Sequence, residues 1–510
     1  MRSYLFLVPA LFLLIIWSSC RKDLEYAQSS GNLAFSKDTV FLDTIFSNIG
    51  SSTYMVKVYN KTRDDVEIPF IRLEQGQSSY YRLNVDGVAG KEFNNVLILA
   101  QDSMFIFIET TYDASANNSN SFLYTDAIHF DAGINLQKIQ LVTLVKDAIF
   151  LFPSTLSDGT KETLVLGLDE NGKEIRVNGF HLSDDELEFT NEKPYVIYGY
   201  AAVTKGKELR MNAGTRVNFH KDSGILITKG ASLKINGELS SDQELLENEV
   251  IFEGDRLESG FENLSGQWGT IWLSKGSVDN VINHLTLKNA TVGLLVEGDK
   301  TVLSPTLIIK NTQIYNSASV NLWAKTATII GENCVFGGAG NSSLYCNLGG
   351  YYLFTHTTIA NYWVHGFRTG TALEIDNFTN DKVSDLIKAD FINCIIDGNM
   401  TRELYLGTNS NDQFNYSFSN CLIKFKDGKA GIEQNPLYDF ENTSHYNSIY
   451  LNRDADFKEA NRNDLRIGEM SFAGEKADLD ISLLLPFDIL GIDRTSSSDI
   501  GAYQINKDQD

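Results

Sequence analysis

The stretch "FINCIIDG", Phe391–Gly398, decides the fold of this chain because it recurs. It places an asparagine, a cysteine and an aspartate close together, which taken alone suggests a reactive or metal-binding site. Five further segments share its spacing of apolar and polar residues: "LTLKNATV", "LIIKNTQI", "TIIGENCVF", "LFTHTTI" and "SFSNCLI". FINCIIDG is therefore one unit of a repeat.

The six units align on one central residue in each. The separations between these central residues are 22, 22, 23, 37 and 27 residues. A period near 22, built from three short strands per turn, predicts a right-handed parallel β-helix. The aligned residues are Asn289, Asn311, Asn333, His356, Asn393 and Asn420.

The columns beside this residue carry a physical meaning. The positions two before and three after it are mostly apolar, and the position one after it is small, so all three are expected to point inward. Inward positions alternate on both sides of the central residue, but the alternation is shifted by one residue there, which requires a bend in the chain. Asparagine tolerates the left-handed backbone of a tight bend. We expect its side chains to hydrogen-bond from rung to rung, in a column that resembles the asparagine ladder of the β-helix family.

The cysteines fit this repeat. Cys334, Cys394 and Cys421 follow the aligned residue directly and are expected to be core thiols. Rungs lie about 4.8 Å apart, so a disulfide between Cys394 and Cys421 is the alternative to the reduced, stacked pair that we expect. Cys346 falls outside the column and is expected at the surface. The chain has no CxxC motif, and we predict neither a metal site nor a cofactor.

The region upstream of the repeat alternates in a different way. Runs such as "STYMVKVYN" and "MFIFIETTYD" within 33–147 predict an antiparallel β-sandwich. The order of the runs resembles the immunoglobulin-like modules of Bacteroidota surface lipoproteins, which act as spacers; ligand binding is the alternative. The segment 148–195 is expected to be a connector with a hairpin around "ENG".

The N-terminus resembles a bacterial lipoprotein signal. One arginine precedes an apolar run too short to span a bilayer comfortably, and Ser18 and Ser19 lead into Cys20. The resemblance implies cleavage before Cys20 and lipidation of this residue; an uncleaved membrane anchor is the alternative. Lys22, Asp23 and Glu25 partly resemble the charged tag associated with surface display, so the protein is expected in the outer membrane, facing either the surface or the periplasm.

The predicted architecture is thus all-β, an antiparallel sandwich followed by a right-handed parallel β-helix. Its expected parts are a signal peptide (1–19), a lipidated tether (20–32), the immunoglobulin-like module (33–147), the connector (148–195), the β-helix (196–430) and a C-terminal closing segment (431–510). The last segment resembles the ending of such lipoprotein domains at Asp488, Gly491, Arg494, Asp499, Gly501 and Tyr503. The net charge of −23 argues against a nucleic-acid partner.

The predicted function is noncatalytic: surface display, adhesion or glycan binding. Relatives with this fold include enzymes, so a polysaccharide lyase or glycoside hydrolase is the alternative, although paired carboxylates are not recognisable in a motif. The long repeat between His356 and Asn393 is expected to extend as a loop. Its residues Tyr362, Trp363, His365 and Arg368 are candidates for a glycan-binding surface; alternatively, its aromatics cover the outward-facing Ile308, Ile330 and Leu353. Carboxylates gathered from neighbouring rungs would favour an enzyme, and aromatics without them would favour binding.

Overall fold

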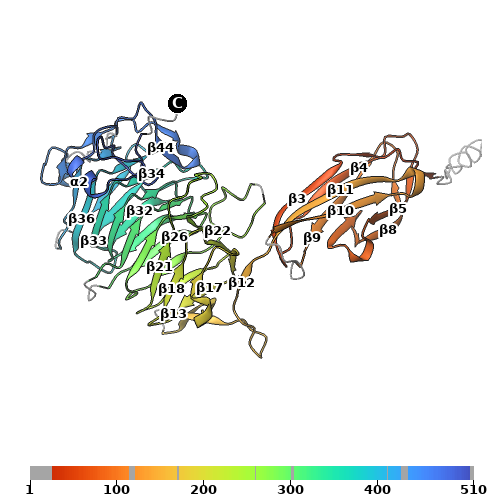
Figure 1. Cartoon of the computed structure of the whole chain (residues 1–510), viewed down its shortest axis with the longest axis horizontal. Coiled ribbons are helices and arrows are strands. Elements are labelled where there is room, and N and C mark those ends of the chain that lie inside the picture. Colours follow the sequence, from red (N-terminus) through yellow and green to blue (C-terminus); the bar gives the residue numbers. More distant parts are fainter. Residues whose placement is uncertain are drawn as a thin grey trace, which may run out of the picture. The chain divides into compact units, whose positions relative to one another are not determined.

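The computed structural model describes residues 26–113, 121–168, 172–258, 260–299, 304–409, 412–426 and 435–505. Cys20, the expected signal peptide and the tag residues Lys22, Asp23 and Glu25 lie outside these described residues. The described chain is all-β and divides into two compact units, Met1–Asp147 and Ala148–Asp510 (Figure 1). None of its described helices is long and apolar enough to cross a membrane.

The first unit contains two sheets that share one hydrophobic core. The six-stranded sheet contains β1 (Ala27–Gln28), β3 (Thr39–Phe46), β5 (Val66–Leu73), β8 (Glu92–Ile98), β10 (Ser121–Phe130) and β11 (Gln137–Lys146). The five-stranded sheet contains β2 (Ala34–Phe35), β4 (Tyr54–Tyr59), β6 (Tyr81–Val85), β7 (Val88–Gly90) and β9 (Ser103–Thr110).

The alternation of side chains explains this core. In β9, Met104, Ile106 and Ile108 are buried, whereas Phe105 and Phe107 between them are exposed. Pairing is mostly antiparallel, but β1 pairs with β5 and β3 with β11 in parallel. Both β1 and β3 lie at the ends of the sheet order. The alternation of apolar and polar residues within a strand does not indicate which strand becomes its neighbour.

The second unit contains three large sheets in which every neighbouring pair is parallel, except β13 with β14. The first parallel sheet contains β12 (Ile149–Leu151), β16 (Tyr195–Ile197), β19 (Arg216–Phe219), β22 (Val250–Gly254), β25 (Leu285–Lys288), β28 (Gln313–Tyr315), β31 (Val335–Phe336), β34 (Thr358–Asn361), β37 (Ile395–Gly398), β40 (Leu422–Ile423) and β42 (Tyr450–Leu451). The second contains β13 (Thr163–Leu168), β14 (Glu174–His181), β17 (Tyr200–Val203), β20 (Gly224–Ile227), β23 (Ile271–Leu273), β26 (Val292–Glu297), β29 (Val320–Lys325), β32 (Ser342–Asn347), β35 (Leu373–Asp376) and β38 (Leu404–Gly407). The third contains β15 (Glu188–Phe189), β18 (Glu208–Met211), β21 (Ser232–Asn236), β24 (Asn280–Asn283), β27 (Leu307–Lys310), β30 (Thr328–Glu332), β33 (Gly350–Thr355), β36 (Leu386–Ile392), β39 (Ser417–Ser419) and β41 (Tyr446–Asn447).

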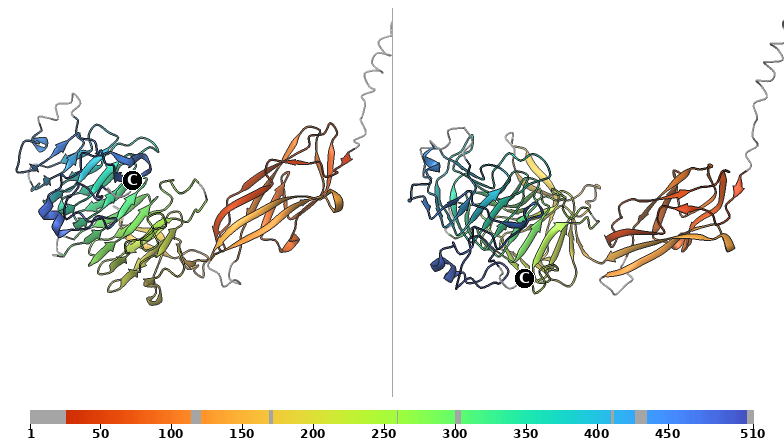
Figure 2. Two further views of the ribbon diagram at one scale, coloured as in Figure 1. Left: turned by 45° about the horizontal axis from the view of Figure 1, so that its top comes forward. Right: turned by 90° about the horizontal axis from the view of Figure 1, so that it is seen from above.

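From β16 to β40 the chain visits these three sheets in turn, so that each of these rungs adds one strand to each sheet (Figure 2). Such parallel stacking is compatible with a β-helix. The segment 148–195 contains the expected hairpin, β13 with β14. However, β12, β14 and β15 from this segment also pair with β16, β17 and β18, so it contributes the first rung rather than a separate connector.

Like side chains stack inside this unit. The rings of Phe354, Phe391 and Phe418 lie parallel on successive rungs, with centroids 5.6 and 5.2 Å apart. A Cβ on Gly331, one rung earlier, would come within 2.4 Å of the Phe354 ring. The Phe354 ring thus occupies the space that a side chain at position 331 would take, which explains why the apolar column contains a glycine at this rung.

The first unit of the expected repeat was misaligned. Asn283 pairs with Lys310, so His284 is the counterpart of Asn311 and Asn289 is not. Only one residue separates β24 from β25, and the chain bends at both His284 (φ 47°) and Asn289 (φ 68°). These two left-handed bends are five residues apart, and the second of them, Asn289, happens to lie 22 residues before Asn311. The 22-residue spacing therefore selects Asn289 instead of His284. The expected inward columns therefore shift on this rung, and Leu287 pairs with Ile314.

The cysteines require one correction as well. Cys334, Cys394 and Cys421 are buried free thiols, each with its sulfur within 3.5 Å of backbone carbonyl oxygens. Cys346 is also fully buried, in β32, and not at the surface as its position outside the column had suggested. Its strand belongs to the second parallel sheet. The alignment on the bend residue covers only the third and first sheets, so it does not reveal the inward positions of the second sheet.

The C-terminal part performs two structural tasks. The short helix η5 (Pro436–Tyr438) packs with Phe440 against the main core beside Phe425. Beyond β42, the chain packs against the outward face of the first parallel sheet through a second apolar cluster (Figure 1). This flank contains η6 (Ala460–Arg462), β43 (Phe457–Glu459), β44 (Asp464–Ile467) and α2 (Leu479–Leu484); other short helices are η1 (Gly76–Ser78), η2 (Gly133–Asn135) and η3 (Asp184–Glu186).

Candidate functional site

The bend column consists of the residues that follow β24, β27, β30, β33, β36 and β39 and connect the third parallel sheet to the first in six successive rungs. All its members have a left-handed backbone, with φ between 46° and 55°. Its members are His284, Asn311, Asn333, His356, Asn393 and Asn420.

The hydrogen bonds along this column are not continuous. Asn333 donates from Nδ2 to Oδ1 of Asn311 over 3.1 Å, and Asn393 donates to Nε2 of His356 over 3.0 Å. Other amides of the column bond to the C-terminal flank: Asn333 donates to the carbonyl of Phe487 and Asn420 to that of Lys476. The column therefore holds the flank in place and acts as structure.

The closing residues that the sequence singled out act in the same way. Asp488 accepts hydrogen bonds from the backbone of Leu490, Ile492 and Gln504, and Asp499 accepts from Glu475 and Ile505. Arg494 is fully buried, and this burial lowers the pKa of its guanidinium to about 10. These residues fix the turns of the flank.

The extra residues of the long repeat are divided between two loops. They form 362–372, between β34 and β35, and 377–385, between β35 and β36. The first loop lies between the first and second parallel sheets, and not over Ile308, Ile330 and Leu353, which belong to the third sheet. The covering role expected for its aromatics is therefore assigned to the wrong surface.

Arg368 in this loop is not available to a ligand. Its guanidinium donates from both terminal nitrogens to Glu403, over 2.8 and 2.6 Å, and the two side chains are only 4% and 0% exposed. Glu403 also accepts from the backbone of Ala372 and Met400. The ion pair ties the loop to the following rung.

The other three loop candidates differ in exposure. Tyr362 is half-buried against Phe457, and burial together with Asp397 raises the pKa of its phenol. Trp363 and His365 contact each other edge to face, with centroids 5.0 Å apart, and His365 is exposed. Only this last pair offers a surface, and it is small.

A larger aromatic surface follows the outward face of the second parallel sheet, which the repeat alignment missed. Six residues are in register on six successive rungs, and we name them the aromatic column. It consists of Trp272, Leu295, Trp323, Tyr345, Glu374 and Tyr405. A matching signal was present in the sequence as "LWA", "LYC", "LEI" and "LYL", where an outward residue lies between two inward ones.

The rings of this column are ordered by their neighbours. Trp323 and Tyr345 are nearly parallel, with centroids 6.0 Å apart, and the Lys325 ammonium lies 4.2 Å from the Trp323 ring centre. Tyr345 donates from its hydroxyl to Asp376 over 2.6 Å. Tyr405 is 44% exposed, and its ring lies over Gly407, where a Cβ would come within 2.8 Å of the Tyr405 hydroxyl.

Two carboxylates stand on the same face. Glu374 accepts hydrogen bonds from Ser342 and from the backbone of Thr371, and burial raises the pKa of its carboxyl. Asp376 accepts from Tyr345, Asn347 and the backbone of Leu348. Asp376 is thus engaged by the protein through both carboxylate oxygens, whereas Glu374 accepts its bonds at Oε1.

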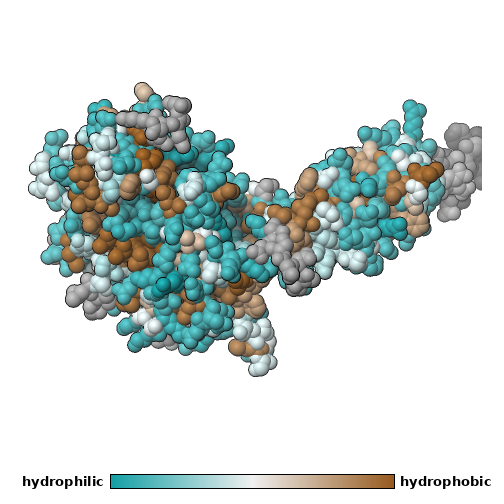
Figure 3. Space-filling view, in the orientation of Figure 1, coloured by the Kyte–Doolittle hydropathy of each residue, from teal (hydrophilic) through white to brown (hydrophobic). Residues whose placement is uncertain are grey.

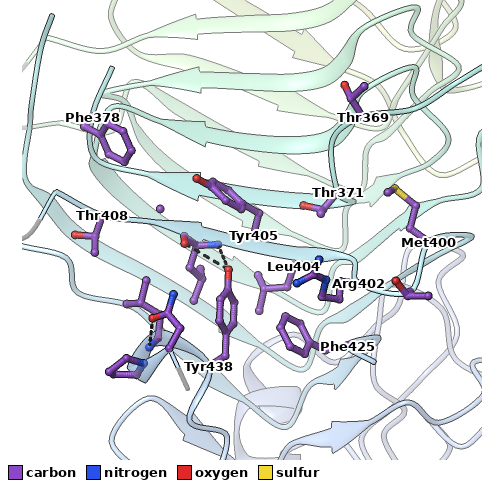
Figure 4. Close-up of a pocket in the computed structure, with 16 residues that line it drawn as sticks. Thr369, Thr371, Phe378, Met400, Arg402, Leu404, Tyr405, Thr408, Phe425 and Tyr438 are labelled. Carbon is purple, nitrogen blue, oxygen red and sulfur yellow. Dashed lines mark hydrogen bonds between the residues drawn. The ribbon is translucent and has the colours of Figure 1, made fainter. Parts of the chain in front are cut away.

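A pocket of about 770 Å³ lies at the end of the aromatic column, where β38 is the last strand of its sheet (Figure 4). Figure 4 shows Tyr405 and Thr371 on one side of the pocket and Tyr438 on the other. The Tyr438 hydroxyl donates to and accepts from the backbone of Leu406 on this strand edge. Arg402, Met400 and Phe378 complete an amphipathic lining.

Two further observations concern metal ligands and apolar surface. Within the described ranges, no group of three His, Cys, Asp or Glu side chains is placed to hold a metal ion. On the face of the second unit seen in Figure 3, apolar residues form small patches between hydrophilic ones.

Comparisons with known proteins give weak likenesses. No family model matches the chain, and no curated protein matches it. Solved structures similar to it include a family 123 glycoside hydrolase from Clostridium perfringens (9% identity, 22% of this chain, 26% of that chain, TM-score 0.16) and the periplasmic chaperone SfaE (10%, 22%, 57%, 0.15). The catalytic unit of a GH87 alpha-1,3-glucanase from Streptomyces thermodiastaticus is similar over 78% of this chain and 88% of that chain, at 10% identity and a TM-score of 0.16. The match spans about a quarter of the first of these chains, and likenesses of this size carry no argument about function.

Proposed function

We propose that this protein is a noncatalytic, glycan-binding protein of the cell envelope. In this proposal, an immunoglobulin-like sandwich precedes a right-handed parallel β-helix, and the glycan lies along the outward face of the second parallel sheet. The observation that carries it is the aromatic column, whose members from Trp272 to Tyr405 are in register on successive rungs.

The chemistry of the column suits a saccharide chain. Aromatic rings offer apolar faces for the C–H faces of sugar rings, and the tyrosine hydroxyls offer polar edges. Rungs repeat about every 4.8 Å, so a linear glycan can meet one side chain after another. Beside the rings, the Lys325 ammonium provides a donor for sugar hydroxyls.

Binding measurements on the second-sheet face test this proposal. A glycan array would identify a ligand, and titration calorimetry with Trp323→Ala and Tyr405→Ala should each show binding weakened about tenfold or more, the usual effect of truncating an aromatic anchor. Tyr351→Ala, an outward tyrosine on the third sheet, is the matched control and should bind like the wild type. Binding that neither variant weakens would contradict the placement, and turnover of a polysaccharide would contradict the noncatalytic role.

One observation favours glycoside hydrolysis as a second candidate. Glu374 and Asp376 lie two positions apart on β35 and face the same side, and the raised pKa of Glu374 suits a general acid. A reducing-end assay with the wild type and Glu374→Gln separates the two functions. Release of reducing ends that is lost in Glu374→Gln would establish the hydrolase.

We further propose that the chain is anchored in the outer membrane by a lipid on Cys20. The N-terminal sequence supports this anchor, because an apolar run and two small residues precede the cysteine. Metabolic labelling with an alkyne fatty acid should mark the wild type and not Cys20→Ala. Protease treatment of intact cells then distinguishes a surface-exposed protein from a periplasmic one.

A further inference from the structure

A second hollow lies at the opposite end of the parallel sheets from the pocket beside β38. It has a volume of about 450 Å³ and is lined in part by Phe152, Tyr198, His220, Lys161 and Lys221. This volume falls within the range of about 300–1,000 Å³ that is usual for small-molecule sites. All its lining residues belong to the second unit and none to the aromatic column.

The register of the first rungs builds one wall of this hollow. Leu151, Ile197 and Phe219 are paired in the first parallel sheet, so the residues that follow them, Phe152, Tyr198 and His220, stack on successive rungs. The Tyr198 and His220 rings are stacked with centroids 4.4 Å apart and planes inclined by 28°, and Phe152 is 59% exposed. The wall is therefore an apolar, partly accessible ring surface.

The same column ends in an ion pair. Gly254 pairs with Phe219, which places Asp255 beside His220 on the next rung, and Oδ2 of Asp255 lies 2.7 Å from Nδ1 of His220. Because a carboxylate only accepts, Nδ1 carries the proton and Nε2 is the imidazole atom left for another partner. The Asp255 side chain is 6% exposed and that of His220 is 47% exposed, so the aspartate orients the ring and the ring faces outward.

The charges around the hollow favour a monoanion. When His220 is protonated, it gives three positive charges together with Lys161 and Lys221, and Asp255 and Asp222 reduce these to one. Arg256 also acts on His220, but its charge is compensated by the ion pair with Glu258. This net positive charge neutralises a ligand that carries one negative charge, whereas a phosphate dianion would leave one negative charge without compensation. A net positive charge stands out in a chain with a net charge of −23.

We propose that this hollow is a binding site for a small carboxylate attached to a ring, such as a uronic acid or an aryl carboxylic acid. The ring lies against the Phe152 and Tyr198 wall, and the carboxylate is recognised by His220 and the two lysines. This site is independent of the proposed glycan face.

The protonation of His220 makes the binding depend on pH. The hydrogen bond that Nδ1 of His220 donates to Asp255 raises the pKa of His220, supported by the charges of Asp255 and Asp222 and opposed by burial and Arg256. The cation that a carboxylate requires therefore persists to higher pH than in an ordinary histidine. Burial raises the pKa of Tyr198 beside it to about 12, so its phenol stays neutral.

Titration calorimetry on the full chain tests the site with four probes and inorganic phosphate. Galacturonate and benzoate are the two carboxylates, and galactose and benzyl alcohol are their uncharged counterparts. We expect at least one carboxylate to bind about tenfold or more tightly than its uncharged counterpart, as expected for a hydrogen-bonded charge. Affinity should fall as the pH rises through the raised pKa of His220, and the better carboxylate identifies the class of ring.

Variants locate the binding. Lys221→Gln and His220→Gln should each weaken it about fivefold to tenfold, while Lys229→Gln, an exposed lysine outside the lining, should leave it unchanged. Lys221→Gln keeps the test valid if His220→Gln fails to fold. The site is overturned if neither carboxylate binds, if the uncharged counterparts bind equally well, if phosphate binds more tightly, or if Lys229→Gln weakens binding as much as Lys221→Gln.

Discussion

Asn393 donates a hydrogen bond from Nδ2 to Nε2 of His356 on the neighbouring rung, over 3.0 Å. The orientation of the asparagine amide is fixed because its Oδ1 accepts from the backbone N–H of Asp478 over 2.7 Å. Nε2 of His356 must therefore accept, and Nδ1 donates to the carbonyl of Gly501. The histidine is held neutral between the bend column and the C-terminal flank.

This arrangement predicts a loss of stability in acid. Burial, with a smaller contribution from Arg494, holds the pKa of His356 well below 6.5, whereas the unfolded chain has an ordinary value near 6.5. The unfolded chain therefore binds a proton that the folded chain does not, and stability falls as the pH drops below about 6.5. In His356→Asn, which copies the residue of the neighbouring rungs, the fall in melting temperature between about pH 7.5 and pH 5 should be smaller than in the wild type. His365→Asn, at an exposed histidine, should leave it unchanged; equal falls in all three proteins would contradict the prediction.

The buried thiols should resist alkylation in the folded protein. Burial raises the pKa of Cys334 to about 12 and raises those of Cys346 and Cys394 as well, and the thiolate is the reactive form. Iodoacetamide at about pH 8 followed by peptide mapping should leave these three and Cys421 unmodified until a denaturant is added. Rapid labelling of Cys346 in the native protein would show that its strand is accessible, as the sequence alone had suggested.

The sequence predicted the register of the rungs correctly where successive bends are separated by one full turn of three strands. From Asn311 to Asn420 the aligned residues are in register, because stacked inward side chains of similar size leave a visible column. The prediction failed at Asn289, where two bends lie close together. A left-handed asparagine marks a bend and does not indicate which sheet follows it.

The candidate site was less predictable for a related reason. Alignment on one bend shows the residues next to that bend, whereas the aromatic column lies one sheet further on, after loops of varying length. The sequence suggests Arg368 as a ligand contact because it belongs to an irregular loop, yet its partner Glu403 comes from the next rung. An ion pair between two rungs depends on the path that the loop takes in space, and the local sequence does not determine this path.

The phenylalanine stack predicts a large core effect. Phe391 is fully buried between Phe354 and Phe418, so Phe391→Ala removes contacts on both sides and leaves a cavity. The free energy of unfolding should fall by about 3–5 kcal/mol, measured by urea unfolding followed by circular dichroism. Phe367→Ala, at a fully exposed position, is the control and should change stability by less than about 0.5 kcal/mol. A small effect at Phe391 would indicate that its neighbours collapse into the space.

The ion pair of Arg368 and Glu403 predicts strong coupling between two substitutions. Both side chains are almost fully buried, so Arg368→Met alone leaves an unpaired carboxylate and should destabilise the protein by about 3–5 kcal/mol. Glu403→Gln alone should cost a similar amount because it leaves the guanidinium without its counter-charge. The double variant Arg368→Met with Glu403→Gln should be more stable than the sum of the two single effects predicts, by about 1–3 kcal/mol. Urea unfolding of the four proteins measures this coupling, and additive effects would show that the pair is not coupled. Glycan binding by the folded double variant should remain, because neither residue belongs to the aromatic column.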